Sequence, residues 1–97
     1  MSIVRHVVVR GRVQGVGYRA WVEDMAERRH LEGWVRNRRD GSVEAVFAGA
    51  ERAVTAAIEA CRQGPRGAHV DSVAAEEGDG TSLQQREGAR FAVLRTA

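Results

Sequence analysis

Near its start, the chain carries three glycines between a valine-rich stretch and an amphipathic one. Residues 3–10 are rich in valine, which predicts a strand buried on both faces at the centre of a sheet. Residues 19–31 are amphipathic, with apolar side chains at helical spacing at Val22, Met25 and Ala26. Glycine permits positive φ angles and close backbone approach. We therefore expect a strand, then a glycine-rich loop, then the first turn of a helix.

Two strand segments follow this first helix. Gly33 is expected to end the helix, because glycine favours the left-handed conformation found just after a helix carboxyl terminus. Residues 33–39 and 42–49 are predicted as strands. Asp40-Gly41 lies between them and favours a type I′ turn. The two strands are therefore expected to pair antiparallel as a hairpin.

The rest of the chain predicts one more helix and two short strands. Residues 51–63 place their apolar side chains on one stripe, and Gly64-Pro65 follows, where proline cannot continue a helix. Residues 70–75 and 91–95 are predicted as two short strands. Residues 76–90, between them, are predicted as an exposed hairpin or loop. This order of elements predicts the α+β class, as a ferredoxin-like α/β sandwich (βαββαβ). Its mixed or antiparallel sheet would be covered on one face by two helices.

Composition indicates one globular domain and excludes several classes of protein. With 97 residues, 43% of them hydrophobic, the chain has room for one core, so a single domain over residues 1–97 is expected. No apolar run approaches the roughly 20 residues of a membrane span, and the start lacks a secretory signal, which favours a cytoplasmic protein. Cys61 has no disulfide partner, and no zinc-site spacing is present. A net charge of +2, with every basic residue an arginine, is weak evidence for nucleic-acid binding.

The glycine-rich loop has the features of an anion-binding site. Amides around Gly15 and Gly17 can turn toward one point, and the first helical amides add unpaired donors in a favourable dipole. Arg19, at the start of the helix, adds a planar guanidinium that can hold two phosphate oxygens. The alternative is a tight connection that binds nothing.

Two other phosphate-binding motifs are excluded. Residues 15–20 satisfy the loose dinucleotide-binding pattern, but the next strand enters a hairpin and leaves no doubly wound parallel sheet. Cys61 and Arg66 are separated by four residues, whereas the loop of the cysteine phosphatases needs five. Cys61 is therefore expected to be a core residue.

Two segments resemble the two signatures of the acylphosphatase family. The first is Gly-Arg-Val-Gln-Gly-Val-Gly-Tyr-Arg at residues 11–19, and the second is Gly-Trp-Val-Arg-Asn-Arg-Arg-Asp-Gly-Ser-Val-Glu at residues 33–44. The spacing between them also fits, and the likeness continues to the last strand, so it covers nearly the whole chain. Tyr18 stands where the family most often has phenylalanine, and Gly17 fills a variable place.

This resemblance implies an enzyme that hydrolyses acyl phosphates to a carboxylate and inorganic phosphate. It implies two catalytic residues, Arg19 for the phosphoryl oxygens and Asn37 for the attacking water. The backbone of the loop would complete the phosphate site, through Gly15, Val16, Gly17, Tyr18 and Arg19. No metal or cofactor is expected, because arginine and backbone dipoles neutralise the phosphate.

Other conspicuous residues are expected to be structural or exposed. The histidines form no motif: they are His6, His30 and His69. The tryptophans, Trp21 and Trp34, are predicted in the core. Two acidic pairs are predicted to be solvated, Glu23-Asp24 and Glu76-Glu77. A basic run brackets Asn37 and would either raise the local phosphate concentration or form a solvated strand face: Arg36, Arg38 and Arg39.

Two other functions are compatible with this order of elements. A non-catalytic, phosphate-binding regulatory module would keep the loop but would gain nothing from a water-positioning amide at Asn37. An RNA recognition motif needs aromatic residues on its central strands, where this chain has valines and arginine. The expected ligands are therefore a small acyl phosphate and its phosphate product, with no nucleic acid and no membrane. The lack of an evident coiled-coil or apolar surface stripe favours a monomer.

Overall fold

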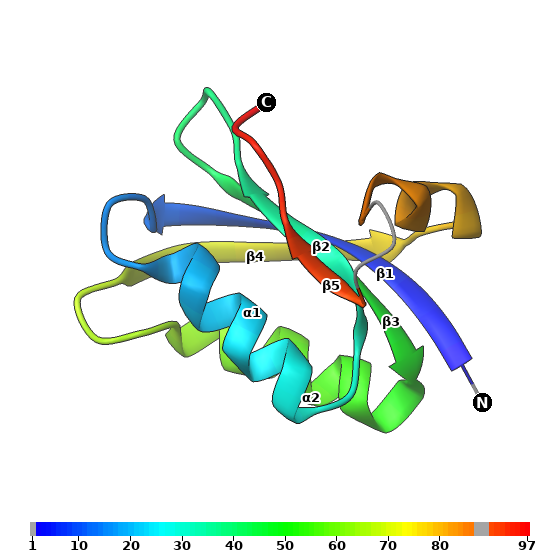
Figure 1. Cartoon of the computed structure of the whole chain (residues 1–97). Coiled ribbons are helices and arrows are strands. Elements are labelled where there is room, and N and C mark those ends of the chain that lie inside the picture. Colours follow the sequence, from blue (N-terminus) through cyan, green and yellow to red (C-terminus); the bar gives the residue numbers. More distant parts are fainter. Residues whose placement is uncertain (1, 87–89) are drawn as a thin grey trace.

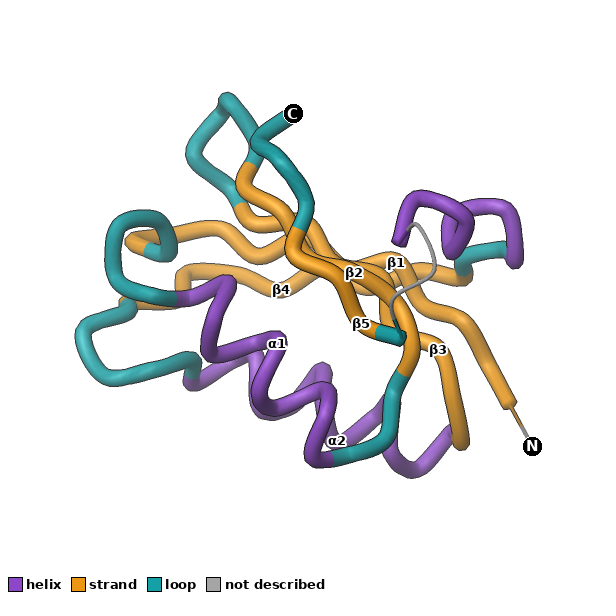
Figure 2. Tube along the Cα trace, in the orientation of Figure 1, coloured by secondary structure: helices purple, strands orange, loops and turns teal. Residues whose placement is uncertain are grey.

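The computed structural model describes residues 2–86 and 90–97, which form a five-stranded sheet with two helices against it (Figure 1). The elements in chain order are β1 (Ser2–Arg12), α1 (Tyr18–Arg28), β2 (Glu32–Asn37), β3 (Val43–Ala50), α2 (Glu51–Gln63), β4 (His69–Glu77), the 3₁₀ segment η1 (Gly80–Arg86) and β5 (Phe91–Val93). Both helices lie on the same side of the sheet (Figure 2). The ferredoxin-like α+β sandwich expected from the sequence is confirmed.

The sheet brings the carboxyl ends of β1 and β2 to one edge. Its strand order is β4-β1-β3-β2-β5. β1 and β2 both pair antiparallel with β3, so they run in the same direction with β3 between them. Val9 of β1 and Asn37 of β2 both lie opposite Val43 of β3. The loop that follows β1 and the side chain of Asn37 are therefore neighbours.

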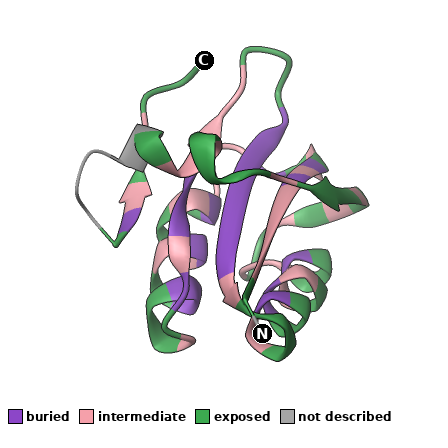
Figure 3. Ribbon diagram, turned by 90° about the vertical axis from the view of Figure 1, so that its right-hand side faces the viewer, coloured by how far each residue is buried: buried purple, intermediate pink, exposed green. Residues whose placement is uncertain are grey.

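The main core lies between the helices and one face of the sheet. The central strand β3 is buried along most of its length (Figure 3). Val7 and Val9 of β1 belong to the core cluster, whereas His6 and Val8 are only partly buried. The prediction that β1 is buried on both faces is therefore wrong. Successive side chains of a strand point to opposite faces, and the helices cover one of them.

The opposite face is covered in part by η1. Trp34, 1% exposed, donates a hydrogen bond from Nε1 to the carbonyl oxygen of Ser82 at 2.7 Å. Asp79 starts this segment, since its Oδ1 accepts hydrogen bonds from the backbone N–H groups of Thr81 and Ser82. The exposed hairpin or loop predicted for residues 76–90 is thus replaced by the end of β4 and a 3₁₀ segment. Residues 87–89 of that prediction lie outside the described residues.

Helix α1 ends before the predicted stop. His30, at φ 58°, takes the left-handed position after the helix, and the N–H of Leu31 bonds back to the carbonyl of Ala26 at 2.9 Å. This closure satisfies free carbonyls of the last turn. Gly33 is instead part of β2 at φ +139°, where a Cβ would lie 1.8 Å from the backbone oxygen of Val46. Close packing against β3 therefore requires glycine there.

The predicted hairpin is confirmed, but its turn is not type I′. That turn needs positive φ at both central residues, and Asp40 does not have it, whereas Gly41 lies at φ +93°. The N–H of Arg38 bonds to Ser42 O at 2.8 Å and that of Gly41 bonds to Arg38 O at 3.1 Å. The carboxylate of Asp40 also accepts a hydrogen bond from the N–H of Ser42 at 2.9 Å. The loop is consequently longer than two residues.

The other predicted elements agree closely with the structure. Helix α2 has the predicted bounds. β4 extends beyond the predicted residues 70–75 at both ends, and β5 is shorter than residues 91–95. No helix among the described residues is both long and apolar enough to cross a membrane.

We expect Gly33→Ala to destabilise the fold strongly, because the new methyl group would meet the Val46 carbonyl in a strained backbone conformation. Overpacking of this kind costs about 1–3 kcal/mol, and the positive φ adds about 1–2 kcal/mol. Urea unfolding measures the loss. Gly80→Ala is the matched control, since its Cβ would meet nothing within 4 Å. Equal unfolding midpoints for the two variants would contradict the assigned role of Gly33.

Candidate active site

The connection from β1 to α1 presents an uncapped helix amino terminus. Gly15 and Gly17 both lie at φ 77°, and a Cβ at either would meet no atom within 4 Å. Gly17 is the residue that precedes α1, and no side chain caps the helix there. The first amides of a helix have no partners within it and face a favourable dipole for anions. This end of α1 is consequently open to a negatively charged group.

A cavity of about 170 Å³ lies at this helix terminus and brings most of the predicted site residues together. Since water occupies about 30 Å³ per molecule, the cavity has room for a phosphoryl group and a water. Its lining includes four of the five loop residues predicted from the sequence, together with Asn37. The lining residues are Val13, Gln14, Gly15, Gly17, Tyr18, Arg19, Ala20 and Asn37. Val16 is not among them, and packs instead against the core.

Arg19 and Asn37 reach this cavity from different elements. Arg19 lies in the first turn of α1 and forms no ion pair with any residue in the described part of the chain. Asn37 is the last residue of β2, and its Oδ1 is buried without a hydrogen-bond partner in the described residues. A buried acceptor without a partner costs about 1–3 kcal/mol. One small cavity is therefore lined by an arginine and by an asparagine, neither of whose functional groups is fully paired within the described residues.

Gln14 joins the loop to the end of β2. The sequence did not predict it as a site residue. Its Nε2 donates hydrogen bonds to the carbonyl oxygens of Arg38 and Ser42, both at 2.8 Å. These two residues flank the hairpin turn that follows Asn37. Gln14 thus fixes the distance between the two sides of the cavity. The sequence shows an amide in the loop, but not which carbonyls lie within its reach.

Tyr18 anchors the start of α1 to the end of α2. Its hydroxyl donates a hydrogen bond to the carbonyl of Cys61 at 2.7 Å, and its side chain is 2% exposed. Burial raises the pKa of Tyr18 above its ordinary value. Burial likewise raises the pKa of the Cys61 thiol to about 12. Cys61 therefore stays protonated near neutral pH and is a core residue, as predicted.

The basic run beside Asn37 does not line the cavity. Arg36 donates from Nε to Glu44 at 2.7 Å and lies 4.7 Å from the ring centre of Trp34. Burial by itself would raise the pKa of Glu44, but hydrogen bonds from His6 and Arg36 outweigh it and hold that pKa below its ordinary value. Glu44 thus counterbalances Arg36 on the opposite face of the sheet.

The remaining histidines, tryptophans and acidic pairs also lie away from the cavity lining. His30 and His69 are exposed, Trp34 is buried and Trp21 is half-buried. Trp21 packs its ring 5.5 Å from that of Tyr18. In the two acidic pairs, Glu23 is half-buried while the other members are exposed: Asp24, Glu76 and Glu77.

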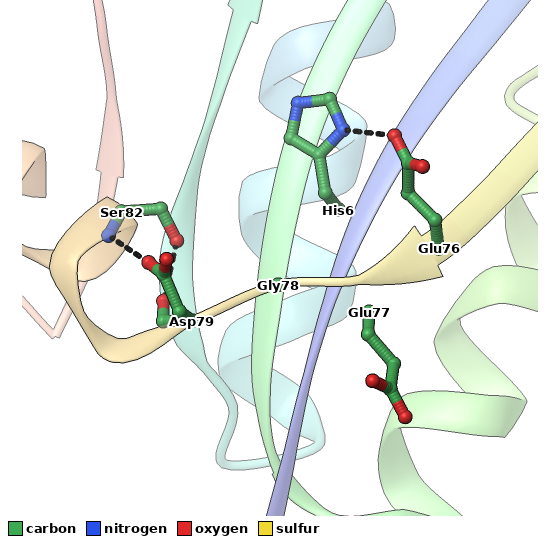
Figure 4. Close-up of a pocket in the computed structure, with 6 residues that line it drawn as sticks. All are labelled: His6, Glu76, Glu77, Gly78, Asp79 and Ser82. Carbon is green, nitrogen blue, oxygen red and sulfur yellow. Dashed lines mark hydrogen bonds and ion pairs between the residues drawn. The ribbon is translucent and has the colours of Figure 1, made fainter.

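A second, larger cavity lies beside the end of β4 (Figure 4). It measures about 440 Å³ and is lined by His6, Glu76, Glu77, Gly78, Asp79 and Ser82. His6 bonds through Nε2 to Glu44 at 2.5 Å, and its Nδ1 lies 3.9 Å from Glu76. Because three carboxylates line the cavity, their negative charge repels phosphate. The smaller cavity is therefore the better anion site.

The chain resembles proteins of one family along most of its length. A sequence model of the acylphosphatase family matches residues 5–92. The chain is 58% identical over 96 residues to an acylphosphatase of Rhodopseudomonas palustris (strain BisB5), covering 98% of this chain and 97% of the relative. It is 55% identical over 94 residues to an acylphosphatase of Bradyrhizobium diazoefficiens, covering 96% and 95% of the two chains. The crystal structure of an acylphosphatase from Bacillus subtilis has a TM-score of 0.83 at 37% identity, over 97% of this chain and 99% of that chain.

These relationships cover the glycine-rich loop, Arg19 and Asn37 in one continuous match. They favour an enzyme over the non-catalytic phosphate-binding module. The match of the family model to most of the chain, together with relatives above half identity over nearly its whole length, leads to one conclusion: the chain belongs to the acylphosphatase family.

Proposed function

We propose that acyl phosphate hydrolysis by this acylphosphatase takes place in the cavity at the amino terminus of α1, with Arg19 and Asn37 as its catalytic residues. The phosphoryl oxygens would bind the Arg19 guanidinium and the backbone amides of residues 15–19. The observation that carries the proposal is that Asn37 lines the same cavity as Arg19 and that its buried Oδ1 has no hydrogen-bond partner in the described part of the chain.

The chemistry asks little of the protein beyond binding and alignment. The leaving carboxylate belongs to an acid whose pKa is about 4, so it departs without a general acid. Phosphoryl transfer passes through a loose transition state, in which positioning and charge stabilisation dominate. Arg19 and the amides at the start of α1 would supply that charge, because within the described part of the chain no side chain caps the helix and Arg19 forms no ion pair.

Asn37 would orient the attacking water. Its side-chain amide would hydrogen-bond the water, which leaves a lone pair of the water oxygen directed at phosphorus. As the new P–O bond forms, the bond from phosphorus to the acyl oxygen breaks and its electron pair leaves with the carboxylate. An amide is a poor base, so the proton passes to a phosphoryl oxygen. The products are a carboxylate and dihydrogen phosphate.

We further propose that the chain acts as a single-domain monomer in the cytoplasm, without nucleic-acid or membrane partners. Val93 is the one exposed large hydrophobic residue among those described, so no apolar patch is available for a partner. RNA recognition on a sheet of this kind uses exposed aromatic rings. Trp34 lies on the face of the sheet opposite the helices, and it is buried beneath η1.

Removal of the Arg19 guanidinium should abolish most of the activity. We expect Arg19→Ala to lower kcat/KM for benzoyl phosphate by about 10²–10³-fold, as loss of a preorganised charge-stabilising group does. It should also weaken inhibition by inorganic phosphate. Arg52→Ala removes an exposed arginine of α2 and serves as the control. Full activity in a folded Arg19→Ala variant would exclude the proposed role.

Removal of the Asn37 amide should affect turnover more than binding. We expect Asn37→Ala to lower kcat by about 10²-fold, because the attacking water loses its alignment. The inhibition constant of inorganic phosphate should change by less than about threefold, since Arg19 and the loop amides remain. Gln63→Ala, which removes an exposed amide at the end of α2, is the matched control. A parallel loss of turnover and phosphate binding would show that Asn37 does not act through water.

Activity should persist in excess chelator. Arg19 and the loop amides provide the positive charge that a metal ion would otherwise supply. Rates of benzoyl phosphate hydrolysis with and without EDTA test this, with a metal-dependent phosphatase in the same buffer as the control. A strict requirement for added Mg²⁺ would contradict the proposed mechanism.

A further inference from the structure

The last residues of the chain extend along β2 as far as Asn37. β5 pairs parallel with β2, ending with Val93 opposite Val35. Residues 94–97 continue beside the same strand toward the hairpin (Figure 1). The N–H of Leu94 donates to Val35 O at 2.9 Å, and the N–H of Ala97 donates to the backbone oxygen of Asn37 at 3.0 Å. We call residues 94–97 the tail.

Ala97 is bound through both of its backbone groups. Besides the hydrogen bond that it donates to Asn37, its carbonyl accepts one from the N–H of Arg39 at 2.9 Å. The two hydrogen bonds join Ala97 to residues on either side of the boundary between β2 and the hairpin turn. On the other side of the strand, Asn37 pairs with Val43 of β3. The backbone of Asn37 is thus held between β3 and the tail.

These backbone hydrogen bonds matter because no hydrogen bond from the described residues holds the buried side-chain oxygen of Asn37, Oδ1. The direction of the Asn37 side chain is consequently set by its torsions and by the backbone that carries them. A shift of about 1 Å in a group that positions a reactant can cost about 10²-fold in rate.

The phosphate-binding groups are carried by another part of the fold. Arg19 and the loop amides belong to the connection from β1 into α1, whereas Asn37 belongs to the end of β2. The tail bonds to β2 and to the hairpin residue Arg39. Loosening it should therefore move the water-positioning side of the cavity relative to the phosphate-binding side.

We propose that Ala97 is a positioning residue for the reaction: its backbone N–H fixes the end of β2 and so holds the side-chain amide of Asn37 in line with the attacking water. This inference rests on the proposed role of Asn37. Ala97 does not touch the reacting atoms, and it acts through the strand alone.

Ala97→Pro tests the proposal, because proline has no N–H to donate to Asn37. We expect kcat for benzoyl phosphate to fall by about tenfold or more, while the inhibition constant of inorganic phosphate changes by less than about threefold. Ala97→Gly keeps the N–H and should recover most of kcat. The exposed side chain of Ala97 contributes little packing that glycine would lose.

A double-mutant cycle separates positioning from general stability. In the Asn37→Ala background, Ala97→Pro should cause almost no further loss of kcat, because the group that it aims is already gone. Thermal unfolding and the phosphate inhibition constant show whether each variant is folded with an intact loop. An equal loss in both backgrounds, or an unchanged kcat in Ala97→Pro alone, would overturn the inference.

The two proposals fail in different ways. If Asn37→Ala leaves kcat unchanged, the role of Asn37 itself is wrong, and the tail has nothing to aim. If Asn37→Ala loses activity while folded Ala97→Pro retains it, only the role of Ala97 is wrong. If Ala97→Pro weakens phosphate binding as much as it lowers kcat, the tail supports the whole site and not Asn37 in particular.

Discussion

The unpaired amino terminus of α1 is the feature on which the rest of the site depends. Gly17 precedes α1 and no side chain bonds to the first amides of the helix, and glycine at this position is only about a few tenths of a kcal/mol less favourable than a side-chain cap. Those amides remain available to an anion because no side chain among the described residues caps the helix. Arg19 adds a charge at the same end. The helix thus lacks a side-chain cap at the end where a phosphoryl group could accept hydrogen bonds from its first amides.

Sheet topology then determines what faces this helix terminus. β1 and β2 lie on either side of β3 and run in the same direction, so their carboxyl ends share one edge of the sheet. The loop after β1 carries the groups proposed to bind phosphate, and the last residue of β2 is Asn37. Gln14 bridges the two by bonding to the carbonyls of Arg38 and Ser42. The site is accordingly assembled by strand pairing and one side-chain bridge.

The sequence predicts the fold well because its signals are local. Helix α2 follows from an apolar stripe that ends at a glycine and a proline, and the hairpin follows from Asp40-Gly41. The predictions that were wrong concern residues whose conformation is determined by tertiary packing. Gly33 suggested a helix stop, but it is required by the close approach of β3, and His30 closes the helix instead. Residues 80–86 carry no periodic signal, and their placement depends on the long-range bond from Trp34.

The site was predictable to a different extent. Residue chemistry alone indicates an anion-binding loop around Arg19, whereas the choice of Asn37 came from the resemblance to a family. Gln14 and Ala97 were not predictable, because each acts through backbone groups distant in sequence. Their acceptors are backbone oxygens, which every residue possesses, so the sequence does not show which of them Gln14 or Ala97 reaches. In the proposed reaction, a phosphoryl group would pair with the first amides of α1, which no side chain caps, and the attacking water would pair with the amide of Asn37.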